Sequence, residues 1–266
     1  MPRTNHPCQA DPRTRLPGHR ASAAHGCGEG PPDPRENRLL RALPDPIYQR
    51  WLDHLTPVDM PLGMVLGEVG QPVEYVYFPT TCIIALSYGL QSGQAAAVSI
   101  IGREAVVGVA MFMGSQSSLD RAVVIGGGQG FRLAAAPLMR EFNQVGATTR
   151  LLLLYTQALM VQIAQAVVCI RHHSLDQRLC RFLLSSLDRI DGTEVKTTHD
   201  LISSVLGVRR EGVTQTMANL QDAGLIRYGR GHITVVDRPG LERRTCECHA
   251  VVKKEYARLQ ATRCVD

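Results

Sequence analysis

Residues 197 to 224 contain two short helical patterns separated by one glycine, and this segment constrains the fold more than any other. Apolar residues repeat at helical spacing from 201 to 206, and Thr197 with Asp200 three positions later predicts an N-terminal cap. Gly207 predicts the end of this first helix. The segment therefore predicts two helices that meet at a tight turn.

The second helix would bury Val213, Met217 and Leu220. Its early, outward surface, together with the start of the first helix, would carry the polar side chains that a helix-turn-helix lays into the major groove, namely Thr198, Arg209, Arg210, Glu211, Thr214 and Gln215. Arginine can bond O6 and N7 of guanine, glutamine N6 and N7 of adenine, and glutamate can accept from N4 of cytosine. A plain helical hairpin with solvated charges would show the same spacing.

Two β-prone runs follow between Leu225 and Val236, with Gly229 and Gly231 between them, and predict a hairpin. A recognition helix followed by a hairpin with a basic tip is typical of a winged helix. The side chains expected to reach phosphate are Arg227, Arg230 and His232. The alternative is a hairpin that only closes a small core.

Length and composition fit a protein of two domains. The chain has 266 residues, 44% of them apolar, and its net charge of +5 suits a polyanionic partner without requiring one. Eight cysteines are scattered along a sequence with no hydrophobic leader, which predicts a cytoplasmic location.

The densest cysteine group is Cys246-Glu247-Cys248-His249, and no CxxC pair occurs. This group would hold a metal or sense oxidants, but two thiols one residue apart rarely complete a site by themselves. The sequence therefore predicts neither a metal site nor a cofactor.

The first 36 residues contain seven prolines without periodicity, which predicts disorder. A transit peptide is the alternative, and the prolines and the acidic residues Asp11, Glu29 and Asp33 argue against it. Ordered structure is expected from Asn37, with a short amphipathic helix over 47–55.

From Val58 to about Arg132 the pattern changes to short β-branched runs punctuated by Gly, Pro and Ser. The expected strands are 63–69, 75–78, 82–88, 95–100, 121–125 and 130–134, spaced as in a β-sandwich or roll. Within this region, the glycine-bracketed stretch 101–114 would cradle an anion or simply form a turn between strands.

Helical periodicity resumes near Thr148 and runs to Ile170 with almost membrane-spanning apolar length. Gln157, Gln162 and Gln165 fall on one arc, so we expect a wetter side and a broad apolar side. We interpret the apolar side as a dimer surface rather than a bilayer contact. A helix capped by Ser174 should follow and pack beneath the helix-turn-helix.

This order of parts resembles the Crp/Fnr family of bacterial transcription regulators over about residues 37–240. The most specific stretch is Arg210-Glu211-Gly212-Val213. The resemblance implies that Arg210 and Glu211 read bases, with Gln215 as a further contact. Family members usually cap this helix with serine, where Arg209 stands here, so the cap is weakened and a phosphate contact is gained.

By resemblance, the fold class is α+β, with an N-terminal antiparallel β-roll of the cyclic-nucleotide-binding type, a long dimerisation helix and a C-terminal winged helix-turn-helix.

The effector residues implied by the same resemblance would be Gly102, Arg103, Glu104, Gly108, Val109, Arg121 and Ala122. Cyclic-nucleotide-binding members have a Gly-Glu pair where this chain has Gly108-Val109. An unpartnered ribose hydroxyl against Val109 would cost about 1–3 kcal/mol, so an unidentified effector is expected instead of cyclic AMP. Cys8 and Cys27 are isolated, unlike the clustered cysteines of iron–sulfur members.

These inferences predict a cytoplasmic homodimer that regulates transcription by binding a palindromic operator in double-stranded DNA. RNA polymerase is a further expected partner, and neither a membrane association nor an enzymatic activity is expected. The competing hypothesis is a sensing scaffold whose winged domain binds protein.

The expected segments are 1–36 disordered, 37–146 β-roll, 147–172 dimerisation helix, 173–240 winged domain and 241–266 helical extension. The extension should pack on the winged domain, with contact to flanking DNA as the alternative.

Overall fold

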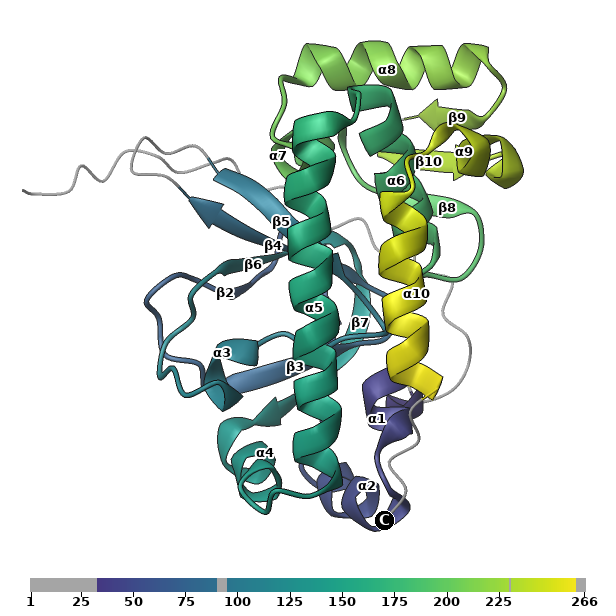
Figure 1. Ribbon diagram of the computed structural model, residues 1–266. Helices are drawn as coiled ribbons and strands as arrows, with labels where there is room; N and C mark the ends of the chain where they lie inside the picture. Colours follow the sequence, from purple (N-terminus) through teal and green to yellow (C-terminus); the bar gives the residue numbers. More distant parts are fainter. Residues whose placement is uncertain (1–32, 90–94, 230, 262–266) are drawn as a thin grey trace, which may run out of the picture. The chain divides into compact units, whose positions relative to one another are not determined.

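The computed structural model describes residues 33–89, 95–229 and 231–261. In these ranges the chain has two β-sheets that form a roll, a long helix beside them, and a C-terminal domain of helices with a small third sheet (Figure 1). This arrangement confirms the α+β fold class. The segment expected to be disordered lies almost entirely outside the described residues.

A buried asparagine attaches the first helices to the roll. The Asn37 side chain accepts hydrogen bonds from the N–H groups of Leu39 and Leu40, and its Nδ2 donates to the carbonyls of Pro79 and Ala105, at 2.9 Å each. All of its polar capacity is therefore satisfied without water. The elements here are η1 (Pro34–Glu36), α1 (Arg38–Ala42) and α2 (Asp45–Leu52).

The roll consists of two antiparallel sheets with strand orders β1-β7-β3 and β2-β6-β4-β5. Its strands are β1 (Thr56–Met60), β2 (Val65–Gly67), β3 (Tyr75–Pro79), β4 (Ile83–Gly89), β5 (Ala95–Ile101), β6 (Arg121–Gly126) and β7 (Gly128–Ala134). The six expected strands are confirmed. Strand β1 was missed because Pro57 and Asp59 interrupt its apolar pattern, and proline is tolerated there because β1 is an edge strand. Gly130 is required, since a Cβ would lie 2.6 Å from the Phe78 carbonyl oxygen.

Two short helices, α3 (Val109–Phe112) and α4 (Ala135–Phe142), precede the long helix α5 (Ala147–His172). One side of α5 packs on the roll, where the buried Tyr155 hydroxyl donates to the Val106 carbonyl at 2.8 Å. The expected wetter side is wrong, because Gln162 is 4% exposed and donates to the Ile100 carbonyl at 2.7 Å. Gln165 also turns inward, and its Nε2 donates to Cys248 Sγ at 3.1 Å.

The exposed side of α5 is apolar. Leu153, Met160 and Val167 are 49%, 65% and 63% exposed. By length and composition α5 would qualify as a membrane-spanning helix, a test that core helices of soluble proteins also pass, and 44% of its most apolar window is buried in the protein. The buried half contacts the roll and the C-terminal helix.

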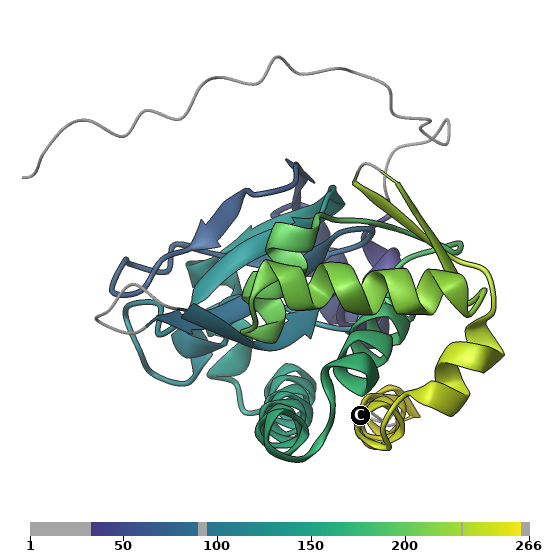
Figure 2. The ribbon, with the colours of Figure 1, turned by 90° about the horizontal axis from the view of Figure 1, so that it is seen from above.

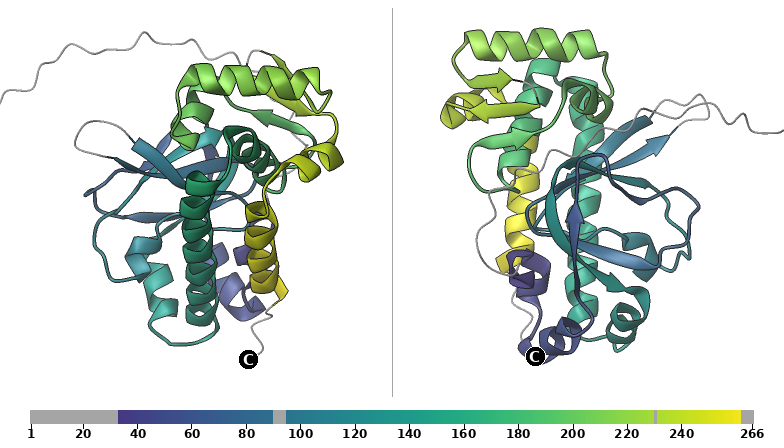
Figure 3. Two further views of the ribbon diagram at one scale, coloured as in Figure 1. Left: turned by 45° about the horizontal axis from the view of Figure 1, so that its top comes forward. Right: turned by 180° about the vertical axis from the view of Figure 1, so that it is seen from behind.

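The C-terminal domain surrounds helix α6, which begins after the predicted Ser174 cap. Ser174 and Gln177 form a reciprocal capping box. The elements are α6 (Leu175–Leu187), β8 (Glu194–Lys196), α7 (His199–Leu206), α8 (Arg210–Asp222), β9 (Ile226–Gly229) and β10 (His232–Val235). The strand order is β8-β10-β9, and α8 lies at the end of α5 away from α1 and α2 (Figure 3). Strand β8 was missed because its three residues contain one apolar side chain, Val195.

The chain continues into α9 (Arg238–Arg244) and α10 (Cys248–Ala261). The extension contacts α6 of the winged domain, as expected, and α10 in addition runs beside α5 (Figure 2). Val252, Tyr256 and Leu259 of α10 join the same apolar core as the roll.

Asp188, at the end of α6, holds α9 and α10 in place. Its carboxylate lies 2.5 Å from Arg238 Nη2 and 2.8 Å from His249 Nε2, with Lys253 Nζ at 3.9 Å. Burial acts to raise the pKa of Asp188, but the hydrogen bonds from His249 and Arg238 outweigh it and lower that pKa well below its usual range.

Replacing this carboxylate tests the role of the contact. We expect Asp188→Asn to lower the free energy of unfolding by about 2 kcal/mol at pH 7, because Arg238 and His249 lose a charged acceptor. The wild-type advantage is present above the pKa of an unfolded aspartate, about 3.9, and should disappear as the pH falls below it toward the lower folded pKa. Urea unfolding, followed by circular dichroism at several pH values, measures both the loss in unfolding free energy and its dependence on pH. The matched control is Asp191→Asn, whose side chain is 86% exposed and should cost less than about 1 kcal/mol. Equal losses in the two variants would contradict the assignment.

Candidate nucleic-acid interface

Helices α7 and α8 meet at the predicted glycine turn. Gly207 ends α7 with a φ of +62°, a conformation that favours glycine. The cap of α7 lies one residue later than expected, because Thr198 Oγ1, and not Thr197, accepts from the Leu201 N–H at 3.2 Å. Arg209 is the N-cap residue of α8 and makes no side-chain cap bond, which agrees with the expected weak cap.

The inner side of this pair builds the domain core. Ile202, Val213, Met217 and Leu220 are fully buried and pack with α6, as the spacing predicted. Gly212 lets α8 lie close to α6, since an added Cβ would come 3.1 Å from Leu175 Cδ2. Because the inner side of α8 is fully buried, the opposite side of the helix faces solvent.

The opposite side of α8 presents the predicted polar set. Its exposed members are Arg209, Arg210, Glu211, Thr214 and Gln215. Gln215 Nε2 donates to Asn219 Oδ1 at 3.1 Å, and Thr214 Oγ1 lies 3.2 Å from His199 Nδ1. The first turns of α8 therefore present both donors and acceptors, and such a surface can meet base edges.

Arg210 has a neighbour across the turn. Its Nη1 lies 3.3 Å from Asp200 Oδ1, and both side chains are more than 60% exposed. An exposed pair of this kind contributes little to stability, so the guanidinium can change partners at low cost. Asp200 was expected to serve the cap of α7, and the angle between the two helices, which the sequence does not encode locally, turns it toward Arg210.

The hairpin after α8 forms as predicted from β9 and β10. Arg227 is exposed on β9, whereas Arg230 lies outside the described residues. His232, expected to reach phosphate, instead contacts the Glu194 carboxylate of β8. Tyr228 packs its ring 5.4 Å from that of His199, joining the hairpin to the start of α7.

The structure does not bring the predicted effector residues together. Gly102, Arg103 and Glu104 meet the end of α6, away from the other predicted effector residues, and Glu104 lines a separate cavity of about 210 Å³ there. Glu104 Oε1 lies 2.7 Å from Arg189 Nε with both side chains buried, and Arg103 Nη2 lies 2.8 Å from Asp191. This trio therefore joins the roll to the C-terminal domain.

The other four residues lie in or beside the roll. Gly108 lines a cavity of about 270 Å³ together with Glu68 and Tyr75. Arg121 places its Nε 3.0 Å from Glu68 Oε2, so the charge that an anion would need is already balanced. The side chain of Val109 packs against the core of the roll, and that of Ala122 is fully buried in it.

Sequence reasoning missed a group of four side chains at the end of α5 and the start of α10. Cys169 and His173, at the end of α5, lie beside Cys246 and Cys248, and their ligand atoms all fall within 4.8 Å of one another. His249, the neighbour in sequence, contacts Asp188 instead. The available signal was the spacing of four between Cys169 and His173, which places both on one side of a helix. His172 is the last residue of α5, and His173 lies at the bend between α5 and α6.

Comparisons with known proteins agree with this geometry. Residues 177–244 match the model of the Crp-like helix-turn-helix domain. The global nitrogen regulator of Synechocystis sp. is 27% identical over 176 residues, covering 62% of this chain and 78% of that protein. That of Synechococcus elongatus is 25% identical over 183 residues, covering 65% and 82%.

Solved structures match the fold around that domain. FixK2 from Bradyrhizobium japonicum has a TM-score of 0.61 at 18% identity, covering 72% of this chain and 98% of that one. A regulator of the Crp/Fnr family from Eubacterium rectale has a TM-score of 0.57 at 20% identity, covering 79% and 98%. The helix-turn-helix match, the nitrogen-regulator relatives and the shared fold together lead to one conclusion: the chain is a DNA-binding transcription regulator that is similar to proteins of the Crp/Fnr family.

Proposed function

We propose that this regulator acts as a cytoplasmic homodimer on a palindromic operator, with each subunit placing the first turns of α8 in the major groove. The exposed set from Arg209 to Gln215, held outward by the buried side of α8, is the observation that carries the proposal. Two subunits related by a two-fold axis would read half-sites about one helical turn apart.

The roles of the individual side chains follow from their chemistry. Arg210 would leave Asp200 and bond O6 and N7 of a guanine, and Glu211 would accept from a cytosine. Gln215 would contact adenine. Arg209 at the start of α8, Thr198 at the start of α7, Arg227 on β9 and Arg230, which lies outside the described residues, would contact phosphates and set the register.

The exposed side of α5 supports the dimer. Outward-facing residues follow alternating spacings of four and three, which is the pattern of a two-stranded coiled coil. They are Leu153, Gln157, Met160, Ala164, Val167 and Arg171. A second copy of this helix would cover the apolar members and give both DNA-binding domains a common axis.

The roll would supply the signal input. Val109 offers no carboxylate for a ribose hydroxyl, and Arg121 is paired with Glu68, so the proposed effector is a molecule other than cyclic AMP. RNA polymerase remains a proposed partner, on the strength of the family resemblance.

Replacing Arg210 by alanine tests the base-reading role. We expect operator affinity to fall by about 1–3 kcal/mol and the preference for one guanine to relax, because a bidentate contact is lost. The measurement is a binding titration on the operator and on a scrambled duplex. Arg41→Ala removes the same charge from α1, far from α8, and should leave the ratio of the two affinities unchanged (Figure 1). An Arg210→Ala protein that keeps the wild-type ratio would refute the role.

Salt dependence separates DNA binding from a protein-binding scaffold. Phosphate contacts release counterions, so the wild-type affinity should fall steeply between two salt concentrations in the same titration. A flat response, or no binding to fragments upstream of its own gene, would favour the scaffold.

A charged side chain on the exposed apolar side of α5 tests whether this side forms the dimer contact. We expect Met160→Glu to give monomers in analytical ultracentrifugation and to weaken operator binding, because burying an unpaired carboxylate opposes pairing of the two helices. Lys254→Glu, an exposed change on α10, is the control and should remain dimeric. A dimeric Met160→Glu protein would place the subunit contact elsewhere.

A further inference from the structure

Three cysteines and one histidine converge where α5 ends and α10 begins. Cys169 lies in the last turn of α5 and His173 is its C-cap residue, while Cys246 precedes α10 and Cys248 is its first residue. The Sγ atoms of Cys169 and Cys246 are 3.6 Å apart, and Cys248 Sγ lies 3.5 Å from His173 Nδ1. Four possible ligand atoms therefore face one another.

Their spacing suits a single tetrahedral ion. Zinc binds thiolate sulfur at about 2.3 Å and imidazole nitrogen at about 2.0–2.1 Å, so tetrahedral ligands stand about 3.8 Å apart for two sulfurs and about 3.6 Å for sulfur and nitrogen. The two short distances match these values, and all four atoms lie within 4.8 Å. Small side-chain rotations would complete the set.

The surroundings hold the ligands in place. The three cysteines are at most 3% exposed, and none forms a disulfide among the described residues. His173 Nε2 lies 3.3 Å from the Glu247 carboxylate, which directs Nδ1 toward the sulfurs. A carboxylate behind a histidine ligand is the usual support of a zinc site.

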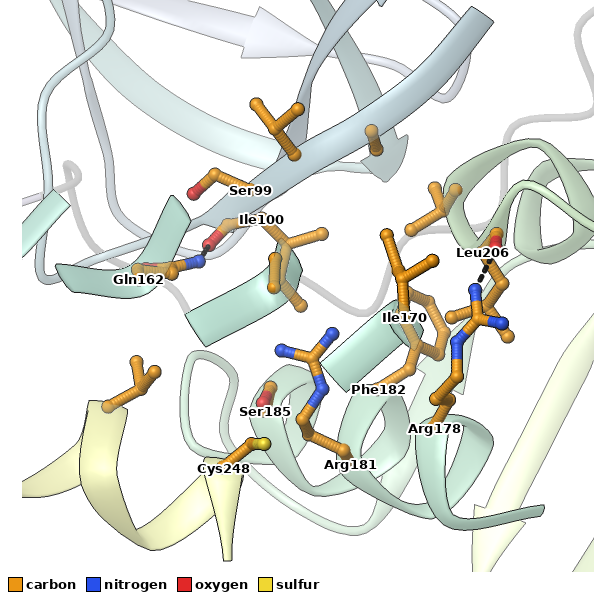
Figure 4. Close-up of a pocket in the computed structure, with 15 residues that line it drawn as sticks. Ser99, Ile100, Gln162, Ile170, Arg178, Arg181, Phe182, Ser185, Leu206 and Cys248 are labelled. Carbon is orange, nitrogen blue, oxygen red and sulfur yellow. Dashed lines mark hydrogen bonds between the residues drawn. The ribbon is translucent and has the colours of Figure 1, made fainter. Parts of the chain in front are cut away.

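The local charge also fits. Three thiolates and one neutral imidazole around Zn²⁺ leave one negative charge. Arg178 and Arg181 both interact electrostatically with Cys169. Arg181 and Cys248 line the same small cavity between α5, α6 and α10 (Figure 4). The guanidinium groups would offset the excess negative charge.

We propose that Cys169, His173, Cys246 and Cys248 bind one zinc ion that fastens the end of α5 to the start of α10. Binding forms three Zn–S bonds and one Zn–N bond and releases three thiol protons to solvent, with no change of oxidation state. The ion joins segments more than 70 residues apart at the bend that leads into α6. The proposal is independent of whether the chain binds an operator.

Metal content is the first test. The full chain, purified without metal-chelating resin, should contain about one zinc per chain by inductively coupled plasma mass spectrometry. Cys248→Ser and His173→Ala should lose it, while Cys180→Ala, which changes a buried thiol outside the group, should retain it. Iron in place of zinc, or equal zinc in Cys248→Ser and wild type, would overturn the proposal.

Two measurements keep the test decisive if ligand variants fold poorly. Co²⁺ added to metal-free wild type should give the absorption of tetrahedral thiolate coordination, and Zn²⁺ should abolish it. Glu247→Gln changes a side chain that is 73% exposed, and it should weaken zinc binding about 10-fold in a chelator competition. Glu36→Gln, an exposed change far along the chain, should have no effect. Octahedral Co²⁺ absorption, or unchanged affinity in Glu247→Gln, would refute the site.

Discussion

The buried ion pair between Glu104 and Arg189 determines how the roll meets the DNA-binding half. Each side chain is 6% exposed or less, so neither charge can be left without the other unless several kcal/mol are lost. The backbones approach so closely that a Cβ at Gly102 would lie 2.8 Å from Arg189 Cβ. Arg103 adds a hydrogen bond to the Arg189 carbonyl at 2.9 Å. The segment 102–104 therefore cannot move without displacing the end of α6, and α6 is the helix on which α8 packs.

Periodicity predicted the elements well because most of them bury one face against a local partner. The helix-turn-helix, its hairpin and six strands follow from spacing and glycine positions alone. Gln162 and Gln165 of α5 were misplaced because the prediction assigned polar side chains to water, whereas Gln162 satisfies a carbonyl of β5 in the interior. Gln157 is exposed as predicted. The sequence predicted an apolar dimer surface on α5, but only the tertiary structure reveals which apolar residues of α5 are exposed.

The candidate sites depended on contacts that no local pattern encodes. The exposed set on α8 was predictable because four of its residues, at 210, 211, 214 and 215, share one helical face and Arg209 precedes them as the N-cap residue. The proposed effector set was taken from a family motif, and the structure divides it between the join to α6 and the wall of the roll. The four zinc-binding candidates form two pairs more than 70 residues apart in sequence, so Cys246 and Cys248 by themselves suggested an incomplete site.

The pairing of Arg210 with Asp200 bears on selectivity. In the free protein the guanidinium already has an anionic neighbour at 3.3 Å, so a DNA phosphate offers it little that Asp200 does not. A guanine, which accepts two parallel hydrogen bonds, offers more. In the proposed complex, Asp200 therefore acts as an internal competitor that lowers the affinity for random sequence more than for the operator. Selectivity of this kind arises from a carboxylate that need not touch the DNA.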